Sequence, residues 1–154
     1  MKPILAVMVG ISGSGKSTYG KGLETSLRVE NGLNTERVST DDIRLELTGN
    51  AEDQTQNGRV FGIARARVSD LLGQKKNVII DATSLSVKDR RDWKILGKTK
   101  GGEVRAYFIN TPISTAKAQN AKRDRVVPDW VIDKQAAKLV APTEAEGFDK
   151  VVTV

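Results

Sequence analysis

Residues 10–17 of this 154-residue chain read Gly10-Ile11-Ser12-Gly13-Ser14-Gly15-Lys16-Ser17. This run fits the Walker A pattern G-x-x-x-x-G-K-[ST] at every fixed position. The apolar residues 4–9 precede it and are typical of a strand that is buried on both faces. A helical pattern follows and ends near Asn31 and Gly32. A glycine-rich turn between a buried strand and a helix predicts a loop that binds phosphate groups.

Each residue type in this loop suits the phosphates of a nucleotide. Glycine adopts positive φ and lets backbone N–H groups approach phosphate oxygens. Lys16 can reach the β- and γ-phosphates, Ser17 can offer its hydroxyl to Mg²⁺, and the following helix presents its N-terminus to the anion. The loop predicts binding of ATP or GTP and by itself does not distinguish a kinase, an ATPase and a GTPase. The chain has no N/T-K-x-D motif of the kind expected in a GTPase, which disfavours that class. The predicted contacts are Gly10, Ser12, Gly13, Ser14, Gly15, Lys16, Ser17 and Thr18.

The chain contains neither Cys nor His, which narrows the chemistry open to it. This composition excludes a disulfide scaffold, a thiolate or imidazole metal site and a Ser-His-Asp triad. Proton transfer must fall to a carboxylate, a lysine or a tyrosine, and the fitting ions are hard ones such as Mg²⁺. The formal net charge is +6, and residues 59–105 hold twelve Lys and Arg against five Asp and Glu. This surplus mildly favours a polyanionic partner.

Short apolar runs alternate with longer helical patterns along the chain, which is typical of an α/β domain. No linker or repeat divides the sequence, so residues 1–154 are predicted to form a single domain. We expect a P-loop NTPase fold, a three-layer sandwich in which helices cover a mostly parallel five-stranded sheet. The predicted strands lie at residues 4–9, 37–39, 77–81, 104–109 and 151–154, and the predicted helices after the loop and near 41–48, 55–74, 86–96, 112–122 and from 128.

Two aspartates follow the second predicted strand, at the edge of the sheet where the phosphate loop opens. One of them, Asp41 or Asp42, can accept the proton of a substrate hydroxyl as it attacks the γ-phosphate. Arg44 lies one turn further on, and its guanidinium suits a substrate phosphate. The plainer alternative makes one aspartate the N-cap of the helix that begins there. Because the chain has no histidine to act as base, the sequence favours the catalytic interpretation.

The predicted strand at residues 77–81 is apolar and ends in Asp81. An acid in this Walker-B-like position can hold Mg²⁺ or its water shell beside the loop serine. Thr83 lies on the same edge and is a candidate substrate contact. Arg90 and its cationic neighbours at 88 and 91 come next, and the sequence favours a solvated helix face for them.

Residues 119–130 are predicted to form a lid. Arg123 and Arg125 stand shortly before Val127 and Pro128 on a predicted hairpin. Arginines on such a hairpin can close over ATP and stabilise the transferring phosphoryl group, an effect of about 10³–10⁵ in rate in other systems. The alternative is a solvated helix C-terminus, where cations interact favourably with the helix dipole. The phosphate loop makes the lid the favoured interpretation.

The combination of these motifs resembles the kinase domain of the phage-type 5′-hydroxyl polynucleotide kinases, which belong to the P-loop kinases. The specific part of the resemblance comprises Asp41-Asp42-Ile43-Arg44, Asp81-Ala82-Thr83 and the lid from Asn120 to Pro128. The resemblance covers about residues 4–140. It implies a kinase-type fold with a helical lid, ATP as donor, Mg²⁺ as cofactor, and phosphoryl transfer to the 5′-hydroxyl of DNA or RNA.

On the donor side, the resemblance implies that Lys16 and Ser17 bind the ATP phosphates and Mg²⁺. Asp81 is expected to support the metal and phosphate site. Arg123 is expected to face the ATP phosphates, with Arg125 as a second candidate on the same lid. The expected catalytic residues are Lys16, Asp41 and Arg123.

On the acceptor side, the resemblance implies that Asp41 is the general base on the 5′-hydroxyl. Arg44 and Thr83 are expected to hold the phosphate that follows the first nucleoside, with Asp81 in the same substrate site. Val127 is expected to lie against the terminal base.

Two other functions stay open at this point. One is a kinase on the same scaffold that acts on a small molecule, such as a nucleoside or sugar, or on an aminoacyl-tRNA. The other is a non-enzymatic, ATP-dependent binder of nucleic acid. The sequence predicts neither a signal peptide nor a membrane span, hence a cytoplasmic protein, with a phage genome in a bacterial host as a candidate origin. Gln119 stands where the family often has another lid arginine, so the lid departs from the family pattern there.

Overall fold

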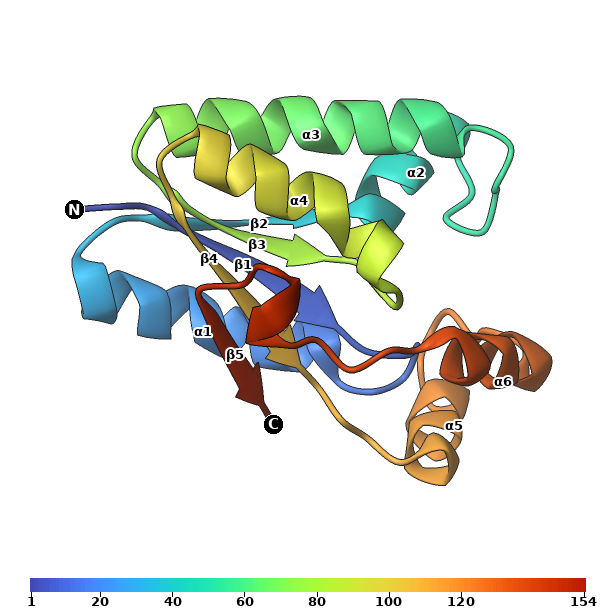
Figure 1. Ribbon diagram of the computed structural model, residues 1–154. Coiled ribbons are helices and arrows are strands. Elements are labelled where there is room, and N and C mark those ends of the chain that lie inside the picture. Colours follow the sequence, from blue (N-terminus) through green and yellow to red (C-terminus); the bar gives the residue numbers. More distant parts are fainter.

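One five-stranded sheet forms the centre of the computed structural model, which describes every residue from Met1 to Val154 (Figure 1). The strand order is β2-β3-β1-β4-β5, and every pair of neighbours is parallel. The predicted α/β class is confirmed, and the sheet is wholly rather than mostly parallel. The strands are β1 Ile4–Val9, β2 Thr35–Ser39, β3 Asn77–Asp81, β4 Glu103–Phe108 and β5 Lys150–Thr153.

Helices cover both faces of this sheet and complete the three predicted layers (Figure 1). One helix, α1, covers one face, and α2, α3 and α4 cover the other. The bounds of these helices are α1 Lys16–Asn31, α2 Thr40–Thr48, α3 Asn57–Gly73 and α4 Val87–Thr99. In α3 the buried residues Val60, Ala64, Val68 and Leu72 recur every fourth position, as expected for a helix with one face on the core. No helix in the structure combines the length and the apolar character needed to cross a bilayer.

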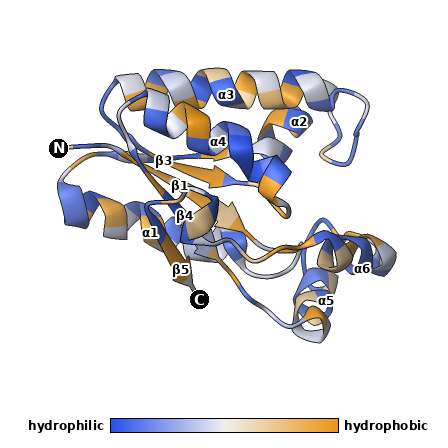
Figure 2. Cartoon of the chain, in the orientation of Figure 1, coloured by the Kyte–Doolittle hydropathy of each residue, from blue (hydrophilic) through white to orange (hydrophobic).

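The sequence of β1 explains its central position. All six of its residues are apolar and buried, and side chains along a strand point alternately to its two faces. Leu5, Val7 and Val9 pack with residues of α2, α3 and α4, whereas the residues between them pack with α1. Figure 2 shows the central strands as mostly hydrophobic, while the helices carry both kinds of residue. A strand without a polar face is stable only where helices cover both sides of it.

Two further helices, α5 Ile113–Ala121 and α6 Asp129–Lys138, lie beyond the carboxyl ends of the central strands (Figure 1). The connection between them carries the predicted lid. The sequence predicts Pro112 and Pro128 at the first helical positions, and this is wrong by one residue. Their ψ angles are 145° and 143°, which are not helical, so each proline is the N-cap of the helix that follows. A short turn of 3-10 helix, η1 Glu144–Glu146, precedes β5.

A buried arginine on α4 corrects one prediction. The sequence favours a solvated face, yet Arg90 has 0% of its surface exposed. Its Nη2 and Nε donate to the two carboxylate oxygens of Glu146 at 2.8 and 2.9 Å. Its Nη1 donates to the backbone oxygens of Ser84, Leu85 and Val140. The later part of the chain returns over α4 and covers this side chain, and no local pattern near position 90 signals that return.

Burial also lowers the share of the basic surplus of residues 59–105 that reaches the surface. Arg90, Lys94 and Arg105 are buried, and each forms an ion pair with a glutamate. Charges that are neutralised inside the protein contribute little to the field that a partner meets. The charge argument for a polyanionic partner is therefore weaker than the residue count suggests.

Replacing Glu146 tests the buried pair. Glu146→Gln is expected to lower the free energy of unfolding by about 3–5 kcal/mol, because it leaves the charge of Arg90 buried without its partner. Equilibrium unfolding in urea, followed by circular dichroism, measures the change. Arg91→Gln alters an exposed neighbour on the same helix and should stay within about 0.5 kcal/mol of the wild type. Equal unfolding free energies for all three proteins would contradict the assignment.

The stabilisation by Glu146 should also depend on pH. Burial by itself raises the pKa of Glu146, but the hydrogen bonds from Arg90 and Lys94 outweigh burial and hold the pKa below its ordinary value of 4.5. A carboxyl group whose pKa is lowered by folding stabilises the protein above its unfolded pKa and loses this effect as the pH falls through the folded pKa. The difference between wild type and Glu146→Gln should be full at neutral pH and shrink below pH 4.5. Urea titrations at a series of pH values check this.

Candidate functional site

Three segments that are far apart in the sequence meet at the carboxyl edge of the sheet. β1 leads into the phosphate loop at Gly10, β2 ends at Ser39 just before Asp41, and β3 ends at Asp81. Ser39 and Asp81 lie opposite each other in the parallel pairing of β2 and β3. Because parallel strands end at the same edge, this arrangement creates the crevice in which open α/β sheets bind ligands.

The phosphate loop is tied to the segments that follow β3 and β4. The Gly10 N–H donates to the Thr83 carbonyl oxygen at 3.1 Å. The Thr111 hydroxyl donates to the Ser14 carbonyl oxygen at 2.8 Å. These bonds join the loop to both neighbouring strands of β1, so its shape is set by the sheet. Thr83, a predicted substrate contact, is partly exposed beside the loop.

Helix α6 holds the loop as well, which the sequence did not signal. The Ser12 N–H donates to Gln135 Oε1 at 2.8 Å, and Gln135 Nε2 donates to Ser12 Oγ at 3.0 Å. Ile11 and Ile132 share a small core cluster at the same contact. Both polar groups of Ser12 are therefore engaged with α6 in this structure, and its contact with a nucleotide stays a prediction.

Two glycines of the loop are needed for different physical reasons. Gly15 has a φ of 98° with open space around it, so its backbone conformation alone favours glycine. Gly13 has a φ of 81°, and a Cβ there would lie 2.2 Å from the carbonyl oxygen of Ala116 in α5. Gly13 therefore also allows α5 to pack directly against the loop.

The N-terminus of α1 suits an anion. Its N-cap, Gly15, supplies no side-chain acceptor, and the first turn contains no acidic residue. The buried Ser14 hydroxyl has no hydrogen-bond partner within the protein. Free donors at a helix N-terminus, next to a glycine-rich turn, fit the phosphates of a nucleotide. ATP would be held here by the loop backbone and by Lys16, with Thr18 exposed at the start of the same helix.

The side chain of Lys16 folds back on the loop, where Nζ donates to the Ile11 carbonyl oxygen at 2.9 Å. Burial of the ammonium group lowers the pKa of Lys16 from 10.5 to about 8. The charges of Asp81 and Asp41 oppose this shift, and the charge of Arg123 adds to it. Both predicted carboxylates and the lid arginine therefore act on one cation, which is still charged at neutral pH.

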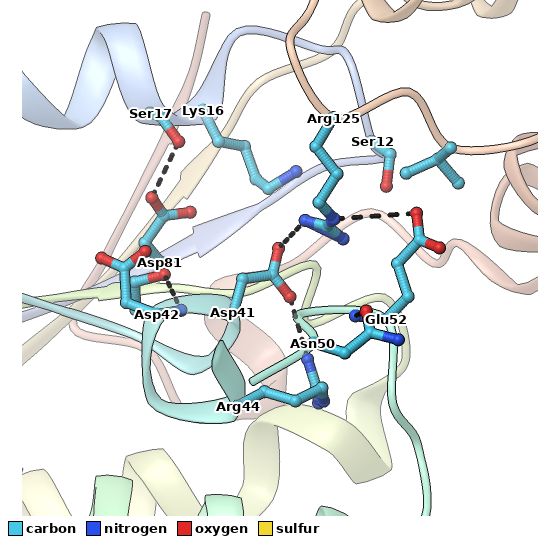
Figure 3. A network of polar contacts seen from close by, with 12 residues as sticks. Ser12, Lys16, Ser17, Asp41, Asp42, Arg44, Asn50, Glu52, Asp81 and Arg125 are labelled. Carbon is cyan, nitrogen blue, oxygen red and sulfur yellow. Dashed lines mark hydrogen bonds and ion pairs between the residues drawn. The ribbon is translucent and has the colours of Figure 1, made fainter. Parts of the chain in front are cut away.

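A hydroxyl and a carboxylate meet where the sequence predicts a metal. Ser17 Oγ donates to Asp81 Oδ2 at 3.0 Å (Figure 3). The structure contains no group of three or more His, Cys, Asp or Glu side chains that suits a metal ion. Mg²⁺ commonly takes one or two protein ligands and completes its shell with phosphate oxygens and water, so Ser17 and Asp81 fit it. Arg37 of β2, which the sequence did not single out, donates to the same Asp81 oxygen at 2.6 Å.

Asp41 lies in the first turn of α2 between two arginines (Figure 3). Its Oδ1 accepts from Arg44 Nη1 at 2.9 Å, and its Oδ2 accepts from Arg125 Nη1 at 3.1 Å. The N-cap of α2 is Ser39, whose hydroxyl accepts from the Asp42 N–H at 3.3 Å. The alternative in which one aspartate is the N-cap is therefore wrong, because the residue before them fills that position.

The two neighbouring aspartates face different partners. Asp42 Oδ2 lies 3.8 Å from Arg37 Nη2, and its side chain is 65% exposed. Asp41 faces the lid arginine instead. Behind Asp41, Arg44 is 5% exposed and donates from both Nε and Nη2 to Asn57 Oδ1, at 3.3 and 3.0 Å. Asn57 is a further residue at this site that no sequence motif indicates.

Asn120 holds the lid connection together. Its Nδ2 donates to the Val127 carbonyl oxygen at 2.6 Å, and its Oδ1 accepts from the Val127 N–H at 3.1 Å. Val127 is 7% exposed and its neighbour Val126 is 51% exposed. The contact of Val127 with a terminal base stays a prediction, and its side chain is buried in this structure. Arg123 is exposed on the same connection.

Known proteins resemble most of this chain. Residues 5–142 match the family model described as an AAA domain. The chain is 33% identical over 127 residues to the adenylyl-sulfate kinase of Pseudomonas aeruginosa. This alignment covers 79% of this chain and 61% of that protein. It is 26% identical over 161 residues to a protein of Autographa californica nuclear polyhedrosis virus named as a bifunctional polynucleotide kinase/RNA ligase. That alignment covers 94% of this chain and 22% of the viral protein, so the chain spans less than two thirds of either relative.

Solved structures show the same fold. A chain in the Pnkp1/Rnl/Hen1 RNA repair complex has a TM-score of 0.75 and 26% identity, over 90% of this chain and 44% of that one. Kti12 of Chaetomium thermophilum, solved with ADP-AlF3, has a TM-score of 0.77 over 97% of this chain and 88% of that one. Its identity is 16%, so this likeness concerns the fold alone. From the match over residues 5–142 we conclude that the chain belongs to the AAA domain family, and its three-layer fold is that of the P-loop kinases.

Proposed function

We propose that this domain transfers the γ-phosphate of ATP to the 5′-hydroxyl of a nucleic acid, with Asp41 as the general base. The position of Asp41 carries the proposal. It lies at the same edge of the sheet as the phosphate loop, its charge acts on the pKa of Lys16, and a lid arginine contacts it. The viral relative and the RNA repair complex support the acceptor class, because their names refer to polynucleotides and to RNA repair.

The proposed reaction is an in-line displacement at the γ-phosphorus. Asp41 accepts the proton of the 5′-hydroxyl while the hydroxyl oxygen forms a bond to the γ-phosphorus. The bond from that phosphorus to the bridging oxygen breaks, and ADP leaves with its electron pair. Lys16 and Arg123 offset the negative charge on the phosphate oxygens. Mg²⁺, held by Ser17 and Asp81 together with phosphate oxygens and water, would supply further positive charge there.

Phosphorylation of a small molecule is the second candidate. The sequence identities favour this candidate. The chain is 33% identical to the adenylyl-sulfate kinase of Pseudomonas aeruginosa and 26% identical to the viral polynucleotide kinase/RNA ligase. The burial of Arg90, Lys94 and Arg105 also removes part of the charge argument for a long polyanion. A compact anionic acceptor would use the same ATP-binding loop for the donor and the same base.

Labelled ATP separates these functions. The protein is incubated with 5′-hydroxyl DNA, 5′-hydroxyl RNA or adenylyl sulfate, and the products are resolved by chromatography. Label on an oligonucleotide supports the proposal, and label on adenylyl sulfate alone supports the second candidate. Nucleotide-dependent binding of oligonucleotides without any labelled product would indicate the non-enzymatic binder.

Asp41→Asn tests the base. The change keeps the size of the side chain but removes the proton acceptor, so kcat on a 5′-hydroxyl oligonucleotide is expected to fall by about 10²–10⁴. The KM for ATP should change little. Initial rates of labelling measure both values. Asp42→Asn is the matched control and should retain most of the activity; loss with Asp42→Asn alone would transfer the role to Asp42.

The lowered pKa of Lys16 predicts a pH-dependent affinity for ATP. The ammonium group is charged below its pKa of about 8 and increasingly neutral above it. ATP binds the charged form, so the Kd for ATP is expected to rise above pH 8, by up to about tenfold per pH unit. Calorimetric titrations from about pH 7 to about pH 9 measure this, and Lys16→Arg should give a flat profile because arginine stays charged. A sloping profile for both proteins would assign the effect to another group.

A further inference from the structure

Arg37 of β2 binds the carboxylate on which the proposed metal site depends. Its Nη1 donates to Asp81 Oδ2 at 2.6 Å. The hydroxyl of Ser17 donates to the same oxygen at 3.0 Å (Figure 3). A hydrogen bond between a guanidinium and a carboxylate is charge-assisted and about twice as strong as a neutral one. Arg37 is therefore a counter-ion that the protein itself supplies to Asp81.

The two donors occupy the oxygen of Asp81 that a cation would use. A carboxylate offers about four lone-pair sites on its two oxygens, and Oδ2 already accepts two hydrogen bonds. Asp81 is 8% exposed, so the solvent screens this pair only weakly. A divalent cation held by both Ser17 and Asp81 would use Oδ2, because this is the oxygen that faces the serine hydroxyl. It would therefore compete with the guanidinium of Arg37.

The position of Arg37 on its strand directs the side chain to this place. Val38 packs into the core cluster that includes α3 and α4, so the neighbouring Arg37 faces the other side of the sheet, where α1 lies. A Cβ added to Gly20 of α1 would lie 3.8 Å from Arg37 Cδ. The aliphatic part of the side chain therefore passes beside α1, and the guanidinium reaches Asp81 from between this helix and the sheet.

A second carboxylate lies near the same guanidinium. Asp42 Oδ2 is 3.8 Å from Arg37 Nη2, which is close enough for an ion pair but too far for a hydrogen bond. A guanidinium that releases Asp81 thus still has a negative charge beside it. This second partner makes the contact with Asp81 exchangeable.

We propose that Arg37 competes with a divalent cation for Asp81 and so weakens binding of the cation when no nucleotide is bound. The inference rests on the metal site of the proposed function and holds for any acceptor. The charge of the guanidinium repels the cation, and its hydrogen bond to Oδ2 must break first. A free cation gains only Ser17 and Asp81 in return, whereas a cation that arrives with ATP also brings phosphate oxygens as ligands.

Binding of Mn²⁺ to the nucleotide-free protein tests the proposal. Mn²⁺ takes the same oxygen ligands as Mg²⁺, and electron paramagnetic resonance measures how much of it stays free. Arg37→Gln is expected to lower the Kd for Mn²⁺ by about tenfold or more, because the competing charge is removed. Equal binding, or binding by neither protein, would overturn the proposal. A higher Kd in Arg37→Gln would also overturn it, since Arg37 would then position Asp81 for the cation.

Two further variants locate the effect. Arg67 lies on α3, on the other side of the sheet from α1, and pairs with Glu46. Arg67→Gln makes the same change in net charge and should keep the wild-type Kd; an equal fall of the Kd there would assign the effect to net charge and overturn the proposal. Adding Asp81→Asn to Arg37→Gln should abolish the gain. A gain that persists in this double variant would place the cation elsewhere and overturn the inference. Circular dichroism and unfolding in urea confirm that each variant is folded.

The result can be read independently of the proposed function. If oligonucleotides are phosphorylated but Arg37→Gln binds Mn²⁺ no more tightly than the wild type, the inference falls and the function stands. If Arg37→Gln binds Mn²⁺ more tightly through Asp81 and no acceptor is phosphorylated, the inference stands and the function falls.

Discussion

The parallel hydrogen bonding of β2, β3 and β1 is the constraint on which the site depends. It brings the phosphate loop after β1, the aspartates after β2 and Asp81 at the end of β3 to one edge of the sheet. The register is enforced by burial, because β1 is covered on both faces and a slip of one residue would exchange the side chains that face the two helix layers. The apolar core therefore determines the geometry of the polar site.

The lid and the two helices that flank it contact both halves of the site. On the donor side, Gln135 of α6 holds Ser12 of the phosphate loop, and Gly13 lets α5 pack against the same loop. On the acceptor side, Arg125 holds Asp41. A movement of α5, α6 and their connection would therefore affect the loop and the candidate base together. This coupling gives the chain a physical means of linking the position of the donor phosphates to the position of the base.

The sequence predicted local elements well and long-range polar contacts poorly. β1 and β3 lie at the predicted residues, because continuous apolar runs identify buried strands. Arg90 was expected in solvent, since a charged residue on a helix usually lies there, but the later chain covers it. Gln135 was not foreseen because its partner is 123 residues away. Such contacts depend on packing that no local pattern encodes.

The sequence by itself determined the phosphate loop, the α/β layers and the restriction of proton transfer to groups other than histidine. These features depend on neighbouring residues, through backbone preferences, the period of apolar side chains and the types of side chain present. The tertiary structure alone decided that Ser39 caps α2, that Asp41 rather than Asp42 faces the lid, and that Arg44 is held between Asp41 and Asn57. These contacts depend on distances of a few ångströms between separate segments of the chain, and only the packed core sets those distances.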